Sequence, residues 1–419
     1  MRGAYEVGVV AGILEVLGVG PTDRAPFGIL AGTSVGAINA AYLAANAHRG
    51  DHDIERLQQV WKSLRLEDHA RIRPFGLLRW PRRVRASLRS ILDIRGIGSS
   101  LLDTRRLERV VVGSLDFEQL HRNVDAGIVS ALLIAALHVV SGRTTVFAEL
   151  APNNPFEPAR GGRRVTRRER IEADHVLASA AIPLLFPTRR VGDHYYCDGG
   201  LRFNTPIAPA IRAGADRIVV ISVRRRRTAH EADAVEAHTV PEQGRDLSPI
   251  FLVGKLLNAL LLDPVEYDLQ VLDRLNRLMG VLQRTLDASE LEAVQRVLIE
   301  ARGVGYRRLR TLVLAPSIDL GRLASEYLRS SLAGRNLNPL VRKLVERATR
   351  TDPGQEADWA SYLLFDGGFA EELMEIGRRD AREQAREILE FFAEAPPSMW
   401  PPSKAPSLVP VPVEGDDAD

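Results

Sequence analysis

Residues 27–44 predict a strand, a sharp turn and a helix, and they constrain the fold more than any other stretch. An apolar run ends in Gly-Thr-Ser-Val-Gly at residues 32–36, and an alanine-rich segment of good helix formers follows. A Gly-x-Ser-x-Gly match has chemical meaning in this context, because such a turn holds its serine in a strained conformation at a strand end. We expect Gly32 and Gly36 to let the helix and the neighbouring strands approach closely.

Ser34 is the candidate nucleophile of this turn. Its hydroxyl would lie beside a helix N-terminus, where free N–H groups favour developing negative charge. The same pattern also arises by chance in a chain with 33 glycines. A serine hydroxyl needs a base to become a nucleophile, so the rest of the chain has to supply one.

Histidine is the usual base, and it has little support in this chain. In one large class of serine hydrolases the acid and then the histidine follow the serine along the chain. None of the nine histidines lies beyond residue 238, and the two that follow Asp198 sit in a polar, arginine-rich segment. A histidine-based triad therefore remains possible, but no residue pattern in the sequence supports it.

An aspartate that acts directly on the serine is the alternative. Asp198 lies at the end of a predicted strand, and Gly199 and Gly200 allow another backbone to come close. Asp198 can also be read as a turn residue that caps its own backbone. A second Asp-Gly-Gly, at residues 366–368, lies in the helical C-terminal part, and we assign it to a helix boundary.

Taken together, these motifs resemble the patatin-like phospholipase family in its bacterial form. The similarity covers roughly residues 1–225, and the pieces occur in the family's order. A weaker similarity to the tail of some bacterial members extends through residues 361–367. The matching segments are residues 2–9, 32–40, 178–187 and 198–206.

The resemblance implies a serine–aspartate dyad without catalytic histidine, metal or cofactor. Ser34 would be the acyl nucleophile and Asp198 its base, in hydrolysis of a fatty acyl ester through an acyl-enzyme. Backbone N–H groups would hold the oxyanion. On this resemblance they belong to Arg2 and Gly3, at the end of a glycine-rich N-terminal loop, and to Val35.

The N-terminus departs from the family pattern. That pattern has a first β-strand, three glycines, one further residue, Arg or Lys, and then Gly, whereas this sequence begins Met1-Arg2-Gly3. Loss of one oxyanion donor typically lowers the rate by about a hundred- to a thousandfold. We expect the true start to lie upstream, with a weakened or inactive chain as the alternative.

The alternation of strands and helices predicts an α/β fold of three layers with a central, mostly parallel sheet and a helical C-terminal extension. The uncharged run at residues 126–142 fits two buried strands better than a membrane span. The predicted parts are a catalytic domain at 1–225, a polar arginine-rich loop at 226–247, a helical region at 248–394 with one strand near 310–315, and a disordered, proline-rich acidic tail at 395–419.

Composition limits the partners and the compartment. A net charge of only +2 argues against nucleic-acid binding, and we interpret the arginine run at residues 224–227 as a solvated loop. The single cysteine, Cys197, fits a reducing compartment. No signal peptide or transmembrane helix is recognisable in the sequence. We therefore expect a cytoplasmic protein, with peripheral attachment to a membrane as a further option.

Three functions are consistent with the sequence. A lipid acyl hydrolase would act on phospholipids or lysophospholipids, and a carboxylesterase on small soluble esters. A scaffold without useful catalysis would act through a membrane-facing or helical surface. Residues 71–85 mix arginine with apolar and aromatic side chains and carry no acid, which indicates either a cap that touches an anionic membrane or a solvated helix face.

Overall fold

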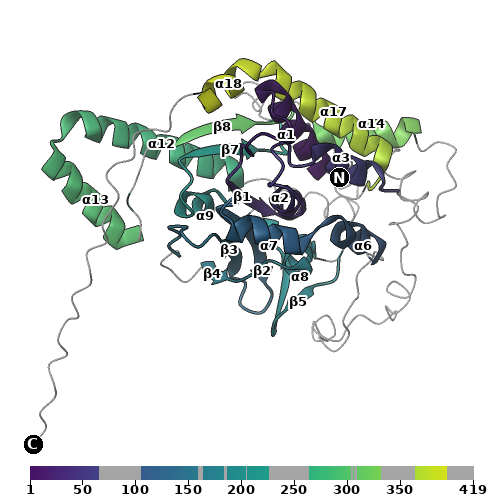
Figure 1. Cartoon of the computed structure of the whole chain (residues 1–419), viewed down its shortest axis with the longest axis horizontal. Helices are drawn as coiled ribbons and strands as arrows, with labels where there is room; N and C mark the ends of the chain where they lie inside the picture. Colours follow the sequence, from purple (N-terminus) through teal and green to yellow (C-terminus); the bar gives the residue numbers. More distant parts are fainter. Residues whose placement is uncertain are drawn as a thin grey trace, which may run out of the picture.

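A computed structural model of the chain shows its fold (Figure 1). The arginine-rich segment at 71–85, the loop at 226–247 and the tail at 395–419, all singled out above, lie outside the residues that the structure describes. It describes residues 1–65, 105–158, 164–183, 186–203, 205–225, 264–302, 305, 309–331 and 364–393.

Six strands form the central sheet. Their order is β4-β3-β2-β6-β5, and β1 also pairs with β2. The inner strands β2 and β3 are almost completely buried, as expected for strands covered on both faces. The strands are β1 (Ile29–Thr33), β2 (Ala131–His138), β3 (Thr144–Leu150), β4 (Arg164–Arg168), β5 (Arg189–Val191) and β6 (His194–Asp198).

The α/β class and the C-terminal helices agree with the prediction, but the prediction of a mostly parallel sheet is wrong. Only β1–β2 and β3–β4 are parallel, whereas β2–β3, β2–β6 and β5–β6 are antiparallel. The reason is the length of the connections. Five residues join β2 to β3 and two join β5 to β6. Connections this short can only form hairpins, because a parallel pair needs a crossover of a dozen or more residues.

Strands β1 and β6 meet end to end along one edge of β2. β1 runs parallel to β2 and places Thr33 opposite Ala135, while β6 runs antiparallel and places Asp198 opposite Ala136. The C-terminal ends of both strands therefore point at each other across adjacent positions of β2. This arrangement brings two segments together that are more than 160 residues apart in the sequence.

A second, two-stranded sheet pairs β7 (Arg217–Ile221) with β8 (Arg310–Leu314) in parallel. Arg217 donates hydrogen bonds to the carbonyl groups of Phe391 and Phe392, at 3.0 and 3.2 Å, and so ties this sheet to the last described helix.

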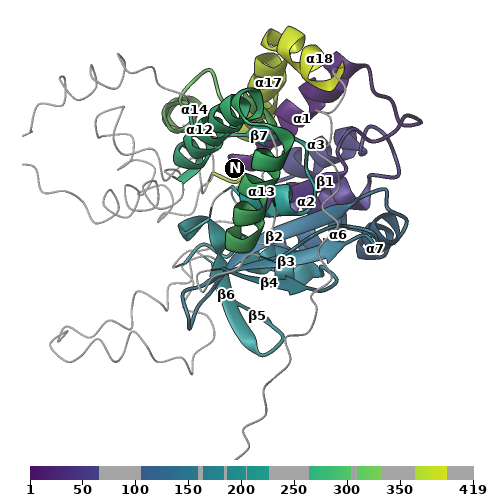
Figure 2. The same cartoon turned by 90° about the vertical axis from the view of Figure 1, so that its left-hand side faces the viewer.

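Helices cover both sheets, and the packing joins the two ends of the chain (Figures 1 and 2). Helix α1 lies along α17 over most of its length, and α3 packs against both. The helices are α1 (Gly3–Leu17), α2 (Val35–Ala45), α3 (Ile54–Lys62), α6 (Arg105–Ser114), α7 (Phe117–Asp125), α8 (Ala173–Ser179), α9 (Ile207–Arg212), α12 (Pro264–Thr285), α13 (Ala288–Arg302), α14 (Leu320–Ser331), α17 (Gly367–Glu383) and α18 (Ala385–Ala393), with a short 3-10 turn at Gly199–Leu201.

Glycines make the crossing of α1 and α17 close. A Cβ at Gly8 would lie 2.0 Å from the carbonyl oxygen of Met374, and one at Gly377 would lie 2.4 Å from that of Tyr5. Beside this contact the Tyr5 hydroxyl donates to buried Asp380 at 3.1 Å. The two helices thus pack backbone to backbone, so the C-terminal helix belongs to the main core.

Among the helices that the structure describes, none combines the length and the apolar character that crossing a bilayer requires.

Candidate active site

Ser34 occupies the turn between β1 and α2 in a strained backbone conformation. Its φ of 57° and ψ of −127° lie in a region that L-residues other than glycine rarely adopt. Close approach is required at Gly32, where a Cβ would lie 2.2 Å from the carbonyl oxygen of Gly36. It is not required at Gly36 itself, because a Cβ there would meet only the Glu6 carboxylate at 3.7 Å, an ordinary contact distance. The expectation of close packing therefore holds for one of the two glycines.

The Ser34 hydroxyl donates a hydrogen bond of 2.6 Å to Oδ2 of Asp198. Asp198 is fully buried, and its other carboxylate oxygen accepts the N–H of Gly200 at 2.7 Å. Asp198 thus caps its own turn with one oxygen and holds the serine with the other. From the sequence, Asp198 could be a turn residue that caps its own backbone or a partner of the serine, and its hydrogen bonds include both contacts.

The register of β2 explains why these two side chains meet. Ser34 follows the last residue of β1, and Asp198 is the last residue of β6, opposite neighbouring positions of β2. The turn after β6 packs tightly on the same strand, since a Cβ at Gly199 would lie 2.4 Å from the carbonyl oxygen of Ala135. Glycine at this position lets the aspartate reach the serine.

Ser179, at the end of α8, is a site residue to which sequence reasoning gave no role. Its hydroxyl accepts the backbone N–H of Ser34 at 3.0 Å and donates to the carbonyl of Ala135 at 2.6 Å. The side chain therefore fixes the strained turn to β2. Ser179 lies inside the segment 178–187 that carried the family resemblance, but its partners become visible only in three dimensions.

Burial raises the pKa of Asp198 to about 6, while the hydrogen bonds from Ser34 and Gly200 favour the ionised form and oppose the rise. A carboxylate in this range is ionised at neutral pH and is also a stronger base than an ordinary aspartate. At neutral pH the Ser34 hydroxyl is therefore hydrogen-bonded to an ionised carboxylate oxygen that can accept its proton.

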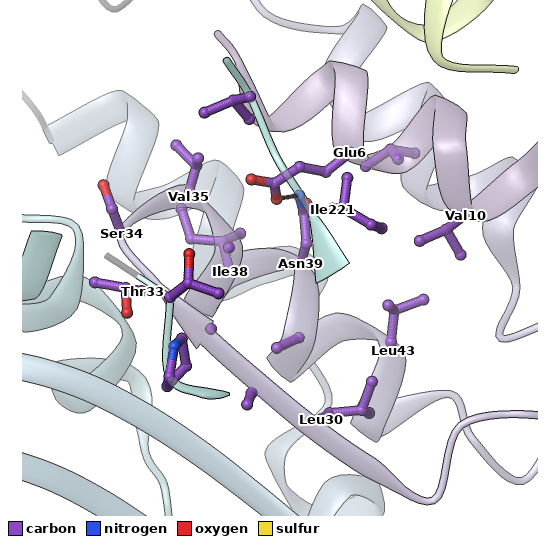
Figure 3. A pocket seen from close by; sticks show the side chains of 18 of the residues that line it. Glu6, Val10, Leu30, Thr33, Ser34, Val35, Ile38, Asn39, Leu43 and Ile221 are labelled. Carbon is purple, nitrogen blue, oxygen red and sulfur yellow. Dashed lines mark hydrogen bonds between the residues drawn. The ribbon is translucent and has the colours of Figure 1, made fainter. Parts of the chain in front are cut away.

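A cavity of about 570 Å³ adjoins the turn and is lined by Ser34 and by many apolar side chains. Figure 3 shows Val10, Ile38, Leu43 and Ile221 around it. This volume lies within the range typical of small-molecule sites, which are mostly apolar with a few polar groups.

Glu6 is an acidic side chain of the cavity wall, and its carboxylate lies 3.7 Å from where a Cβ at Gly36 would be. It accepts a hydrogen bond of 2.8 Å from the Asn39 amide, the contact drawn as a dashed line in Figure 3. Asn39 in turn accepts from the Trp61 indole at 3.1 Å and donates to the Gly3 carbonyl at 3.0 Å. Withdrawal from water raises the pKa of Glu6 to about 7, against the opposing effect of Asn39.

The three residues expected to bind an oxyanion lie close to the turn. Val35 is the first residue of α2, where helix N–H groups lack acceptors within the helix. Arg2 and Gly3 begin α1, and a Cβ at Gly3 would lie 2.9 Å from the Cβ of Val35. Arg2, Val35 and Ser34 all line the cavity.

The competing candidates lie elsewhere. None of the described histidines is hydrogen-bonded to Ser34 or Asp198. The second Asp-Gly-Gly marks a helix boundary, as expected, because Asp366 caps α17 by accepting the N–H groups of Gly368 and Phe369. Within the described ranges, no group of three or more His, Cys, Asp or Glu side chains is arranged to hold a metal ion.

The strand–turn–helix with a serine at its strained corner defines an α/β protein of the nucleophile-elbow type. Comparison with known families gives a match to the patatin-like phospholipase family over residues 1–211, half of the chain, and the chain belongs to this family. Membership suggests a lipid acyl hydrolase. No curated protein matches the sequence.

Proposed function

We propose that this protein is a serine acyl hydrolase that cleaves fatty acyl esters of phospholipids or related lipids with a Ser34–Asp198 dyad. The observation that carries the proposal is the hydrogen bond of 2.6 Å between the Ser34 hydroxyl and the buried carboxylate of Asp198. Membership of the patatin-like phospholipase family supports the reaction class.

In the proposed mechanism, Asp198 takes the hydroxyl proton as Ser34 Oγ attacks the ester carbonyl carbon. The tetrahedral intermediate collapses, and the leaving alcohol receives the proton from Asp198. Asp198 then deprotonates a water molecule that attacks the acyl-enzyme, and the fatty acid is released with regeneration of the Ser34 hydroxyl. The N–H of Val35, supported by the N-terminal end of α2, would stabilise the oxyanion, together with the backbone at Arg2 and Gly3.

The cavity supports an acyl chain as the substrate group. Apolar side chains of α1, α2 and β7 line it beside Ser34. Burial of methylene groups against such a wall contributes about 0.8 kcal/mol per group, so longer chains should bind more tightly until the cavity is filled.

The test is hydrolysis of short and long p-nitrophenyl acyl esters by the full chain and by two variants, Ser34→Ala and Asp198→Asn. We expect each substitution to lower kcat/KM by at least about a thousandfold, because the dyad acts as a unit. A higher kcat/KM for long esters would support a lipid substrate, and the reverse order would indicate a carboxylesterase for small esters.

Asp366→Asn is the matched control. It makes the same change in the other Asp-Gly-Gly sequence, and asparagine still caps a helix. We expect it to retain the activity of the unchanged chain. Activity that survives Ser34→Ala would contradict the proposal, and so would a folded wild-type chain with no activity on any ester, which would favour a non-catalytic scaffold.

A further inference from the structure

The hairpin that joins β2 to β3 presents two adjacent valines to solvent at its tip. Val140 is 83% exposed, the highest value among the large apolar side chains that the structure describes, and Val139 is 45% exposed. Such turns ordinarily carry Gly, Asn, Asp or Ser, because these residues adopt turn conformations or hydrogen-bond the nearby backbone. Exposed valines at the tip bury no apolar surface in the folded chain. We name Val139, Val140 and Arg143 the hairpin tip.

The hairpin tip is held in a fixed shape. The N–H of Gly142 donates to the carbonyl of His138 at 2.9 Å, and the N–H of His138 donates to the carbonyl of Arg143 at 2.9 Å. A further bond of 2.9 Å runs from the N–H of Val139 to the carbonyl of Tyr195 on β6. The two valines are therefore presented by a hydrogen-bonded scaffold.

Arginine side chains flank the valines. Arg143 is exposed beside them, and the exposed Arg202 donates a hydrogen bond of 2.7 Å to the carbonyl of Gly142. Arg164 is exposed at the start of β4, opposite Thr144. Residues 126–148 contain no Asp or Glu. The neighbouring β5–β6 turn carries one exposed acid, Asp193, which Arg190 pairs at 3.0 Å. Two apolar side chains flanked by arginines complement the headgroup region of an anionic bilayer.

The hairpin tip is also connected to the candidate active site. β2 places Ala136 opposite Asp198 and ends at His138. Val140 lies four residues beyond Ala136, which a chain spans in at most about 14 Å. The neighbouring β5–β6 hairpin lies at the end of the molecule away from α17 and α18 (Figures 1 and 2). A membrane that binds this end of the molecule would therefore hold the candidate dyad close to the membrane lipids.

We propose that the hairpin tip docks the protein on anionic phospholipid bilayers by inserting Val139 and Val140 below the headgroups while the flanking arginines bind lipid phosphates. A protein partner fits less well, because stable interfaces bury about 1,200 Å² or more and the apolar part of this surface is two side chains. The docking itself does not require catalysis; its role in delivering substrate rests on the proposed function.

The test is sedimentation of the full chain with vesicles of phosphatidylcholine alone or of phosphatidylcholine mixed with phosphatidylglycerol. We expect preferential binding to the mixed vesicles, weakened by salt. The double variant Val139→Ser/Val140→Ser should bind at least about tenfold more weakly. Arg143→Gln should bind roughly fivefold more weakly to the mixed vesicles and should change little on phosphatidylcholine.

Val297→Ser is the matched control, because Val297 is a similarly exposed valine on α13. It should bind vesicles like the unchanged chain. Hydrolysis of a short soluble ester should be the same in all these variants, and Ser34→Ala should still sediment with vesicles, so failure of docking and failure of catalysis are distinguishable. Equal binding of the hairpin variants and the unchanged chain would overturn the proposal. Absence of vesicle binding, or an oligomer that the valine substitutions dissociate, would overturn it as well.

Discussion

At the scale of single residues, the backbone of Ser34 stores strain that a glycine would release. Conformations of this kind cost on the order of 1–3 kcal/mol in a residue with a Cβ, and glycine's greater unfolded entropy offsets about 0.5–1 kcal/mol of that gain. We predict that Ser34→Gly is more stable than Ser34→Ala by about 1 kcal/mol. Both variants lack the hydroxyl, so their free energies of unfolding in urea isolate the backbone effect. A lower stability of the glycine variant would contradict the strain.

The raised pKa of Asp198 predicts a specific pH dependence. Only the ionised carboxylate can take the Ser34 proton, and burial raises its pKa to about 6. We therefore expect kcat/KM for a p-nitrophenyl ester to fall about tenfold per pH unit below pH 6 and to level off above pH 7. Circular dichroism over the same range controls for acid unfolding. A rate that stays constant down to pH 4.5 would contradict the assignment of Asp198 as base.

The raised pKa of Asp198 also predicts how stability changes with pH. A carboxylate in a salt bridge stabilises the fold when it ionises, whereas ionisation of Asp198 should destabilise it. The pKa of Asp198 is higher in the folded chain than its ordinary value of 3.8, so folding opposes its ionisation. Stability is therefore lost as pH rises from about 4 to about 6 and stays lower above that range. We expect Asp198→Asn to match or exceed the unchanged chain in thermal midpoint at pH 7.5. A midpoint lowered by several degrees would show instead that the carboxylate stabilises the fold.

The pairing of Ser34 with Asp198 could be predicted from the sequence, whereas the residues that hold the Ser34 turn and the cavity wall in place could not. A serine in a glycine-flanked turn and an aspartate before a glycine pair are visible as short patterns. The hydrogen-bond partners of Ser179 are at least 44 residues away in the sequence, and those of Asn39 are at least 22 residues away. No local sequence pattern marks such contacts. The need for glycine at position 32 but not at 36 likewise depends on the angle at which α2 leaves the turn.

At the scale of secondary-structure elements, apolar runs located the inner strands but not their directions. β2 is a continuous apolar run, and β3 has an apolar centre at residues 146–148. Apolar runs are the pattern of strands buried on both faces, and that pattern also occurs in parallel sheets. Their direction follows from the short turn between them. The edge strand β4 and the three-residue β5 are charged and partly exposed, so they carry no apolar run that would predict a strand.

The crossing of α1 and α17 makes a prediction at the level of one helix pair. Gly8→Ala would place a Cβ 2.0 Å from the backbone of Met374, and the helices would have to move apart. We expect a loss of about 1–3 kcal/mol or more in the free energy of unfolding. Gly113→Ala on α6 is the matched control, because nothing lies within 4 Å of its Cβ and alanine should stabilise the helix by about 0.5–1 kcal/mol. Equal effects of both changes in urea unfolding would contradict the close packing.

At the scale of the whole molecule, the core extends beyond the region that the family match covers. The match ends at residue 211, yet Phe369, Leu373 and Ile388 are fully buried in helices α17 and α18. Glu15 of α1 also forms ion pairs with Arg378 and Arg382, at 3.0 and 2.8 Å. The division of the chain at residue 225 remains a prediction, and this packing argues that the first part needs the C-terminal helices to fold.

Truncation tests that dependence. We predict that residues 1–225 alone aggregate or show no cooperative thermal unfolding, because the apolar face of α1 would lose its cover. A chain that ends at residue 395 keeps α17 and α18 and should unfold at the same temperature as the full chain. A soluble 1–225 fragment with the full chain's thermal midpoint would show that the C-terminal helices are dispensable.

The most direct test of the Ser34–Asp198 dyad is covalent labelling of the nucleophile. The full chain is treated with a fluorophosphonate, which phosphorylates activated serines, and the adduct is mapped by peptide mass spectrometry. We predict one adduct, on Ser34, with labelling at least about a hundredfold slower in Asp198→Asn and unchanged in Asp366→Asn. An adduct on another residue, or esterase activity without any label on Ser34, would contradict the Ser34–Asp198 dyad.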